Sequence, residues 1–290
     1  MKYRVSHSTN YSYSDPVTSH NMLHLKPRKT PQQECLRSEI TISPVPKFTA
    51  ERQDYFGNTV TYFSMEERHD ALKVGAVSEV NVAPFVPPLV EFTPPWEDVR
   101  DRLAEIAPAH LDAVQYLHET EHVKFDPELT EYAEVSFTPR RPVLDAVMDL
   151  THRIFKEFAY DRNATSINTA PIDILRMRKG VCQDFTHLEI ACLRSLGIAA
   201  RYVSGYLQTR PPPGEEPSKL IGADASHAWL AFYCPEFGWI SVDPTNDLVP
   251  SDKHIVVSWG RDYADVSPVK GVVLGGGRHT MTVAVEVVPI

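Results

Sequence analysis

Helices come before strands in the second half of this chain, and that order most constrains its fold. The spacing of apolar residues predicts helices over residues 141–159, 171–179 and 182–196. The third ends before Gly197, a residue type that commonly stops helices. Strands are then predicted at ARYVSGYL, SHAWLAFY and GWISVDPT. A run of helices followed by a run of strands indicates an α+β domain.

The first 90 residues are rich in short strand patterns. KYRVSHSTNYSYSD and ECLRSEITISP mix polar residues with β-branched and aromatic ones, and DYFGNTVTYFSM carries a hairpin turn at Gly-Asn. This spacing predicts a β-sandwich. Five prolines between residues 84 and 95 then indicate a linker. We therefore expect an N-terminal β-sandwich domain at 1–95, a helical linker region at 96–140 and an α+β domain at 141–290.

Composition narrows the class of protein. The chain has 290 residues and a net charge of −9, and no basic run stands out, so nucleic acid is not an expected partner. No apolar run reaches the roughly 18 residues of a membrane span, and the N-terminus lacks an export signal. The four cysteines, at positions 35, 182, 192 and 234, show no C-x-x-C spacing. Reduced thiols and a cytoplasmic location are the resulting expectation.

Cys182 stands at the start of the predicted helix 182–196, in the stretch RKGVCQDFTH. The sequence around it is compatible with a buried structural thiol, a metal ligand or a nucleophile. At a helix N-terminus the dipole stabilises a thiolate. The free backbone N–H of that position can also bind an oxyanion.

A nucleophilic cysteine needs a base, and the nearest histidine is a poor one. His187 lies about 140° round the helix from Cys182, so we expect a surface or supporting histidine. Cys192 falls in the apolar stripe and is expected in the core, and Cys35 and Cys234 are expected to be structural. Zinc binding by Cys182, His187 and His227 lacks the paired spacing of zinc ligands.

His227 and Asp243 offer a second source for the base. They lie on consecutive predicted strands joined by the turn residues CPEFG. If the loop has an odd number of residues centred on Pro235, His227 stands directly opposite Asp243 on the same face. The carboxylate would then bind His227 Nδ1 and orient the ring. A hydrogen-bonded structural histidine and an ordinary Asp-Pro turn explain the same residues without catalysis.

GVCQDFTHLEIACLRSLGIAARYVSGYL, SHAWLAFY and GWISVDPTND together resemble the bacterial transglutaminase-like superfamily. YSYSDPVTSHNMLHLKPR and DYFGN resemble the β-domain that precedes this core in bacteria. The resemblance implies a papain-like transglutaminase core with Cys182 as nucleophile, His227 as base and then acid, and Asp243 as orienter. It makes Tyr160 a candidate for the oxyanion hole and Gln183 and Trp229 candidates for the substrate pocket. It implies neither a cofactor nor a metal.

The implied chemistry is cysteine-dependent acyl transfer on peptide or protein amides through a thioester. We expect hydrolysis, as in a cysteine peptidase or amidase. A protein-glutamine gamma-glutamyltransferase is the alternative, and a non-catalytic binding or scaffold module on the same fold is the second. A peptide or protein is the expected partner, with no role for nucleic acid or membrane, and the oligomeric state is not predicted. The proline-rich loop at 211–217 is a candidate lid or substrate rim.

Overall fold

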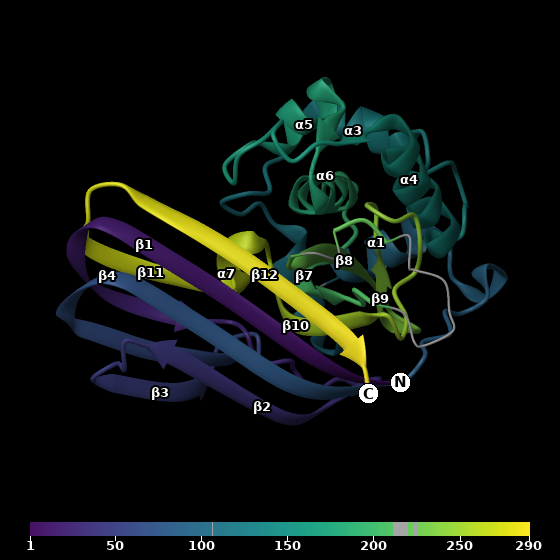
Figure 1. The fold of residues 1–290 in the computed structure, drawn as a ribbon. Helices are drawn as coiled ribbons and strands as arrows, with labels where there is room; N and C mark the ends of the chain where they lie inside the picture. Colours follow the sequence, from purple (N-terminus) through teal and green to yellow (C-terminus); the bar gives the residue numbers. More distant parts are fainter. Residues whose placement is uncertain (106, 211–219, 223–224) are drawn as a thin grey trace.

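The computed structural model describes residues 1–105, 107–210, 220–222 and 225–290. The proline-rich loop predicted as a lid lies outside these residues. The fold combines a long antiparallel β-sheet region with an α+β region, as Figure 1 shows. Within the described residues no helix is long and apolar enough to cross a membrane.

Six strands form the first sheet, with the order β11-β1-β4-β2. β12 also pairs with β1, and β3 pairs with β4. The strands are β1 (Lys2–Leu23), β2 (Gln33–Ser43), β3 (Phe48–Gln53), β4 (Thr59–Val82), β11 (Val269–Gly275) and β12 (His279–Pro289). The predicted hairpin at DYFGN is confirmed as the β3–β4 connection, where Gly57 takes a φ of 74°.

The two longest strands, β1 and β4, bend this sheet over on itself. Their pairing shifts register between Ser12 and Val17, and such bulges bend strands sharply. β12 and β2 pair beyond one side of the bend, and β11 and β3 beyond the other. Leu72 and Phe63, from the two halves, belong to one buried core cluster. The halves therefore pack face to face, which gives the sandwich predicted for this region.

The last two strands come from the end of the chain. β12 runs beside the start of β1, and the Ile290 N–H donates to Lys2 O at 2.9 Å, so the termini lie together (Figure 1). Both strands fall within the domain expected at 141–290. The alternation in HTMTVAVEVV predicts the strand β12, but it does not specify which sheet that strand joins.

The second sheet has four antiparallel strands in the order β10-β7-β8-β9. They are β7 (Ala200–Leu207), β8 (His227–Cys234), β9 (Gly238–Val242) and β10 (His254–Gly260). β7, β8 and β9 coincide with the three strands predicted from the sequence. Along β8, Ala228, Leu230 and Phe232 join the main core, whereas Trp229 and Ala231 belong to a separate cluster on the opposite face.

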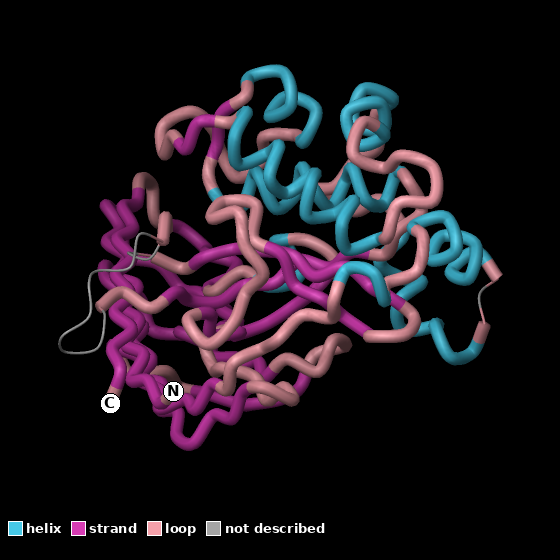
Figure 2. The backbone as a smooth tube through the Cα atoms, turned by 90° about the vertical axis from the view of Figure 1, so that its right-hand side faces the viewer, coloured by secondary structure: helices cyan, strands magenta, loops and turns pink. Residues whose placement is uncertain are grey.

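Helices cover the face of this sheet that carries the main core, as Figure 2 shows in cyan. α6 (Cys182–Ser195) lies at the centre and packs against β8. Around it are α1 (Trp96–Ala104), α2 (Leu111–Val114), α3 (Pro127–Glu134), α4 (Val143–Glu157), α5 (Pro171–Met177) and α7 (Tyr263–Val266). Short 3-10 turns span Val90–Phe92, Pro108–His110 and Gln115–Leu117, and β5 (Ala159–Tyr160) pairs with β6 (Lys179–Gly180).

The segment predicted as a helical linker region packs into the same core as α6. Val99 and Leu103 of α1 and Leu129 of α3 are fully buried there. The first half of residues 96–140 forms several short helices and not one long helix. Pro108 cannot donate a backbone hydrogen bond, so a helix cannot run through it from the preceding residues. These residues therefore form part of the wall around α6.

Candidate active site

The N-terminus of α6 is fixed by the side chain of Asp184. Its Oδ2 accepts from the Val181 N–H at 2.8 Å and from Thr165 Oγ1 at 2.6 Å. This satisfies one of the donors that a helix start leaves free. Cys182, the first residue of the helix, is half-buried. Its thiol therefore has a fixed position with access to solvent.

His227 begins β8 and Asp243 directly follows β9. The predicted odd-numbered loop is confirmed, with three residues between Cys234 and Gly238. The predicted register is wrong: Leu230 faces Val242, so the pattern sets Asp243 beside Trp229 instead of directly opposite His227. The error is two residues, which keeps both side chains on the same face of the sheet. A diagonal pair at this spacing is still within side-chain reach.

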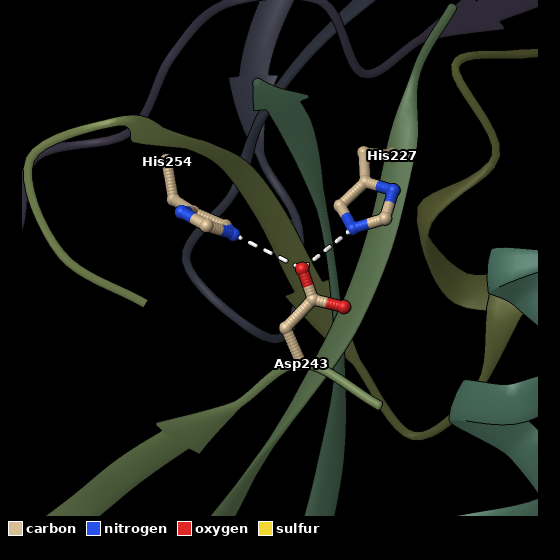
Figure 3. Close-up of side chains that lie close together, drawn as sticks. All are labelled: His227, Asp243 and His254. Atoms are coloured by element: carbon tan, nitrogen blue, oxygen red, sulfur yellow. Dashed lines mark hydrogen bonds and ion pairs between the residues drawn. The ribbon is translucent and has the colours of Figure 1, made fainter. Parts of the chain in front are cut away.

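His227 and Asp243 are hydrogen-bonded in the interior. The distance between His227 Nε2 and Asp243 Oδ2 is 2.8 Å, and both side chains are fully buried (Figure 3). The expected nitrogen was Nδ1, and this expectation is wrong. Nδ1 points away from the carboxylate and has no hydrogen-bond partner among the described residues. It is therefore the nitrogen available to exchange a proton with another group.

The group that acts on His227 besides Asp243 is the thiol of Cys182. Burial alone would lower the pKa of His227, but the Asp243 carboxylate and then the Cys182 side chain raise it to about 10. The imidazolium is thus the stable form at neutral pH, with a carboxylate bound to it and a thiol that acts on its pKa. This is the order of groups that activates a cysteine.

Four donors hold Asp243 in its ionised form. Its Oδ2 accepts from His227, from His254 Nε2 at 3.1 Å and from Asn246 Nδ2 at 2.8 Å, and its Oδ1 accepts from the Thr245 N–H at 3.0 Å. Burial would raise the pKa of Asp243, but the charge and hydrogen bond of His227, with that of His254, keep it well below its usual range. Multiple donors to a carboxylate have this effect.

His254, at the start of β10, is a site residue that the sequence analysis missed. It is buried against the same carboxylate oxygen as His227 (Figure 3). Burial lowers the pKa of His254 more than Asp243 raises it, so this ring stays neutral at pH 7. The Asp243 carboxylate thus accepts hydrogen bonds from a charged ring, His227, and from a neutral ring, His254. No local sequence pattern marks His254, because only the pairing of β10 with β7 brings it to the site.

His227, Asp243 and His254 are also the group within the described residues whose ligand atoms could surround a metal, all within 4.8 Å of one another. Both histidines use Nε2 to donate to Asp243. The zinc set considered from sequence is not assembled, because His187 Nε2 instead accepts from the Tyr263 N–H at 3.2 Å.

Two family models match the chain. The bacterial transglutaminase-like N-terminal region matches residues 3–81, and the transglutaminase-like superfamily matches residues 131–244, so together they span most of the chain. The chain belongs to the transglutaminase-like superfamily. The second match contains Cys182, His227 and Asp243.

Relatives of this transglutaminase-like chain extend over both regions. An uncharacterised protein of Mycobacterium tuberculosis (strain ATCC 25618 / H37Rv) is 40% identical over 300 residues, covering 99% of this chain and 93% of the relative. A protein-glutamine gamma-glutamyltransferase of Pseudomonas aeruginosa is 34% identical over 95 residues, or 32% of this chain and 14% of the relative. The fold resembles the crystal structure of a candidate cysteine protease from Cytophaga hutchinsonii, with a TM-score of 0.75 at 22% identity over 99% of this chain and 90% of that one.

The structure also places the candidates for the oxyanion hole and the substrate pocket, Tyr160, Gln183 and Trp229. Tyr160 is on β5, and its ring packs 6.5 Å from that of Phe185 in the main core. Gln183 turns towards the preceding loop, where its Nε2 donates to Ile167 O at 3.3 Å. Trp229 is fully buried, with its ring stacked 6.0 Å from that of His227. It therefore supports the histidine from one side.

His187, Cys192 and Cys234 have surroundings of their own, apart from the Asp243 carboxylate. His187 is buried and stacks on His122 at 5.4 Å, so it is a supporting residue and not a surface one. Cys192 is fully buried in the main core, and Cys234 is buried at the end of β8. Burial raises the pKa of both thiols, that of Cys234 to about 11.

Two tyrosines near Cys182 were also missed by the sequence analysis. Burial raises the pKa of both Tyr202 and Tyr263, and the charge of Cys182 raises each further. Both phenols therefore stay neutral at pH 7. A neutral phenol is a hydrogen-bond donor.

Proposed function

We propose that this protein catalyses acyl transfer on peptide or protein amides, with Cys182 as nucleophile, His227 as base and Asp243 as orienter. The observation that carries the proposal is the position of His227. Its Nε2 is held by the Asp243 carboxylate, and its pKa responds to the Cys182 thiol. A structural histidine would need only one of these two partners.

The reaction follows from this order of groups. Because His227 is an imidazolium at neutral pH, the proton already lies on its Nδ1, and the thiolate sulfur of Cys182 attacks the amide carbonyl carbon. His227 then returns the proton to the leaving amine as the C–N bond breaks, which leaves a thioester on Cys182. Asp243 keeps the ring oriented and stabilises its charged form throughout, without itself taking the proton.

The negative oxygen of the tetrahedral intermediate needs donors at the helix start. Cys182 is the first residue of α6, where a helix leaves the backbone N–H unpaired, so this N–H can bind that oxygen. Tyr160 remains our candidate for a side-chain donor. Gln183 and Trp229 remain candidates for the substrate pocket, with Trp229 acting as a wall behind His227.

Water is our proposed acceptor for the acyl group, which makes the protein a cysteine peptidase or amidase. Cys182 is half-buried, so its thioester stays open to solvent. Transfer to an amine is the second candidate, and the similarity to the Pseudomonas aeruginosa gamma-glutamyltransferase over 95 residues favours it. We further propose a cytoplasmic location, since all four thiols are free.

A peptide library incubated with and without a primary amine tests both acceptors. Mass spectrometry would detect cleavage or deamidation if water accepts the acyl group, and amine incorporation if an amine does. Cys182→Ala should abolish every product, whereas Cys35→Ala, a change at a half-buried thiol on β2, should leave them unchanged. A folded wild type without any turnover would favour the binding or scaffold module instead.

A further inference from the structure

A cavity of about 620 Å³ lies between the N-terminal sheet region and the second sheet. Thr30 and Phe56 line it from the first region, and Arg201, Trp239 and Trp259 line it from the second. Arg201 and Trp239 contact each other on the sheet face opposite α6, where Trp229 and Val203 also cluster. The cavity is therefore separate from the helix that carries Cys182. Its volume suits a small organic ligand.

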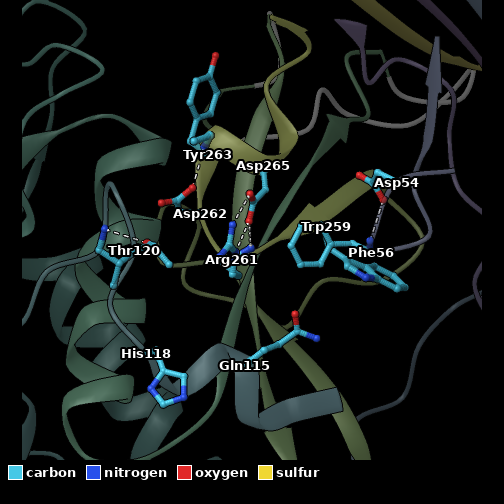
Figure 4. A network of polar contacts seen from close by, with 12 residues as sticks. Asp54, Phe56, Gln115, His118, Thr120, Trp259, Arg261, Asp262, Tyr263 and Asp265 are labelled. Atoms are coloured by element: carbon cyan, nitrogen blue, oxygen red, sulfur yellow. Dashed lines mark hydrogen bonds and ion pairs between the residues drawn. The ribbon is translucent and has the colours of Figure 1, made fainter. Parts of the chain in front are cut away.

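Arg201 is the unusual residue of this cavity. Its Nε is buried without a partner, and within the described residues its guanidinium makes no hydrogen bond or ion pair. By contrast, the buried Arg194 donates to the carbonyl oxygens of Ala200, His118 and Arg261. Arg261 is itself paired with Asp265 (Figure 4). Arg201 as a whole is half-buried, and a partly desolvated cation without an acceptor is costly unless something supplies one.

Aromatic rings hold the Arg201 guanidinium in place. Its carbon lies 3.7 Å from the centre of the Trp259 ring and 4.3 Å from that of Trp239. These contacts partly offset the burial of the charge. Burial still lowers the pKa of Arg201 to about 9, and the charges that act on it are those of Tyr116 and Arg28, with no carboxylate among them. The cation is positioned but not neutralised.

A second arginine, Arg28, lies behind the Trp259 wall; its Nε is also buried without a partner, but its Nη atoms have acceptors. Arg28 also stacks on Trp259, 3.2 Å from the ring centre. Its Nη1 donates to Phe56 O at 3.2 Å and to Asn58 Oδ1, and the charge of Asp54 acts on it. Arg201 and Asp112 are the charged side chains that line the cavity, and among the described residues no ion pair joins them. The Arg201 guanidinium is therefore free to pair with a ligand that carries one negative charge.

The rest of the lining is flat and apolar with a few polar groups. Phe56, Gln115 and Trp259, drawn in Figure 4, come from three separate segments of the chain. Tyr116 packs edge-on against Trp239 at 5.1 Å. Burial raises the pKa of Tyr116 to about 12, so its hydroxyl is a donor at neutral pH. Such walls suit the planar body of a ligand, and the guanidinium suits its acidic end.

We propose that this interdomain cavity binds a carboxylate attached to a flat apolar group, with the carboxylate on Arg201 and the flat group between the aromatic walls. A planar carboxylate accepts two parallel bonds from a guanidinium. The chemistry is shared by the C-terminus of a peptide that ends in an aromatic residue and by a simple aromatic acid. The site is independent of the proposed acyl transfer, since it contains none of Cys182, His227 and Asp243.

Calorimetry with matched acids and amides tests this site in the full chain. The probes are N-acetylphenylalanine and its amide for the peptide source, and 4-phenylbutyrate and its amide for the organic acid. Each acid should bind at least about tenfold more tightly than its amide, which corresponds to one charge-assisted pair. Arg201→Met should abolish that preference, and Arg37→Met, at an exposed position on β2, should keep it. Cys182→Ala should bind as the wild type does, which separates this site from catalysis.

Equal binding of acid and amide, or no acid binding up to millimolar concentrations, would overturn the proposal. Tighter binding of phenyl phosphate than of either acid would overturn the assignment to a single negative charge. If Arg201→Met does not fold, wild-type NMR decides instead. The phenyl protons of the bound acid should then show contacts to the indoles of Trp239 and Trp259, and their absence would place the ligand elsewhere.

Discussion

Asp243→Asn is the substitution whose effect follows most directly from the electrostatics of the site. The Asp243 charge and hydrogen bond are the largest of the effects that raise the pKa of His227 to about 10. Without them burial dominates, and the pKa should fall below the ordinary value of about 6.5. The fall is at least roughly 3.5 units, or on the order of 5 kcal/mol in favour of the neutral ring.

Asp243→Asn would therefore leave His227 mostly neutral at the pH of the assay. At pH 8 the wild-type imidazole should be almost fully protonated, whereas under about a twentieth should be protonated in Asp243→Asn. Long-range ¹H–¹⁵N NMR of labelled histidine measures this titration directly. Acyl transfer should fall by roughly 10³- to 10⁴-fold, as for other triads that lose their carboxylate.

Asp247→Asn is a matched control, because Asp247 pairs with the half-exposed His152 close to the same turn. It should leave the titration of His227 unchanged.

The pH dependence of stability is a further check, since the pKa of His227 is raised on folding. That contribution is complete below about pH 6.5 and is lost as pH rises through about 10, and Asp243→Asn should lack this loss. A His227 that still titrates near pH 10 in the variant would refute the reasoning.

Three further predictions concern the surroundings of the triad. Gly222→Ala should abolish activity, because φ is 88° and a Cβ there would lie 2.8 Å from His227 Nδ1. The matched Gly238→Ala, where φ is 74° and the space is open, should cost about 1 kcal/mol of stability without loss of activity. Equal activities of the two variants would contradict the predicted clash with His227. Burial raises the pKa of Glu189 to about 8, so the folded protein should lose about 3–5 kcal/mol of stability as pH rises from about 4.5 to 8, and Glu189→Gln should flatten this slope in urea titrations. An unchanged slope would show that Glu189 is not the titrating group. Limiting iodoacetamide should label Cys182 first, since burial raises the pKa of Cys35, Cys192 and Cys234; faster labelling of Cys35 or Cys234 would weaken the assignment.

Much of the site was predictable because it rests on local patterns. The start of α6 at Cys182 and the strands β8 and β9 follow from periodicity and turn residues. The odd number of residues in the hairpin loop, which sets His227 and Asp243 on one face, was expected because the pairing requires it and not from the loop sequence. The two-residue error in register did not change that face, so the pairing of the two residues was found despite it.

Other features depend on contacts between distant segments and have no local pattern. His254 reaches Asp243 only because β10 pairs with β7, and β12 joins β1 across almost the whole chain. The choice of His227 Nε2 over Nδ1 depends on the angle at which the ring meets the carboxylate. In the sequence, Arg201 is an ordinary charged residue near the start of a predicted strand. Only the packing of the N-terminal sheet against the second sheet shows that its guanidinium lacks a hydrogen-bond acceptor.

The central claim is that Cys182 carries the acyl group, and trapping the acyl-enzyme tests it most directly. The protein would be mixed with p-nitrophenyl acetate, quenched in acid within the first turnover and mapped by mass spectrometry. The account predicts one acetyl group on the peptide that contains Cys182. It also predicts none in Cys182→Ala and an unchanged adduct in Cys35→Ala. An acetyl group on another cysteine, or burst release of p-nitrophenol by Cys182→Ala equal to that of the wild type, would contradict it.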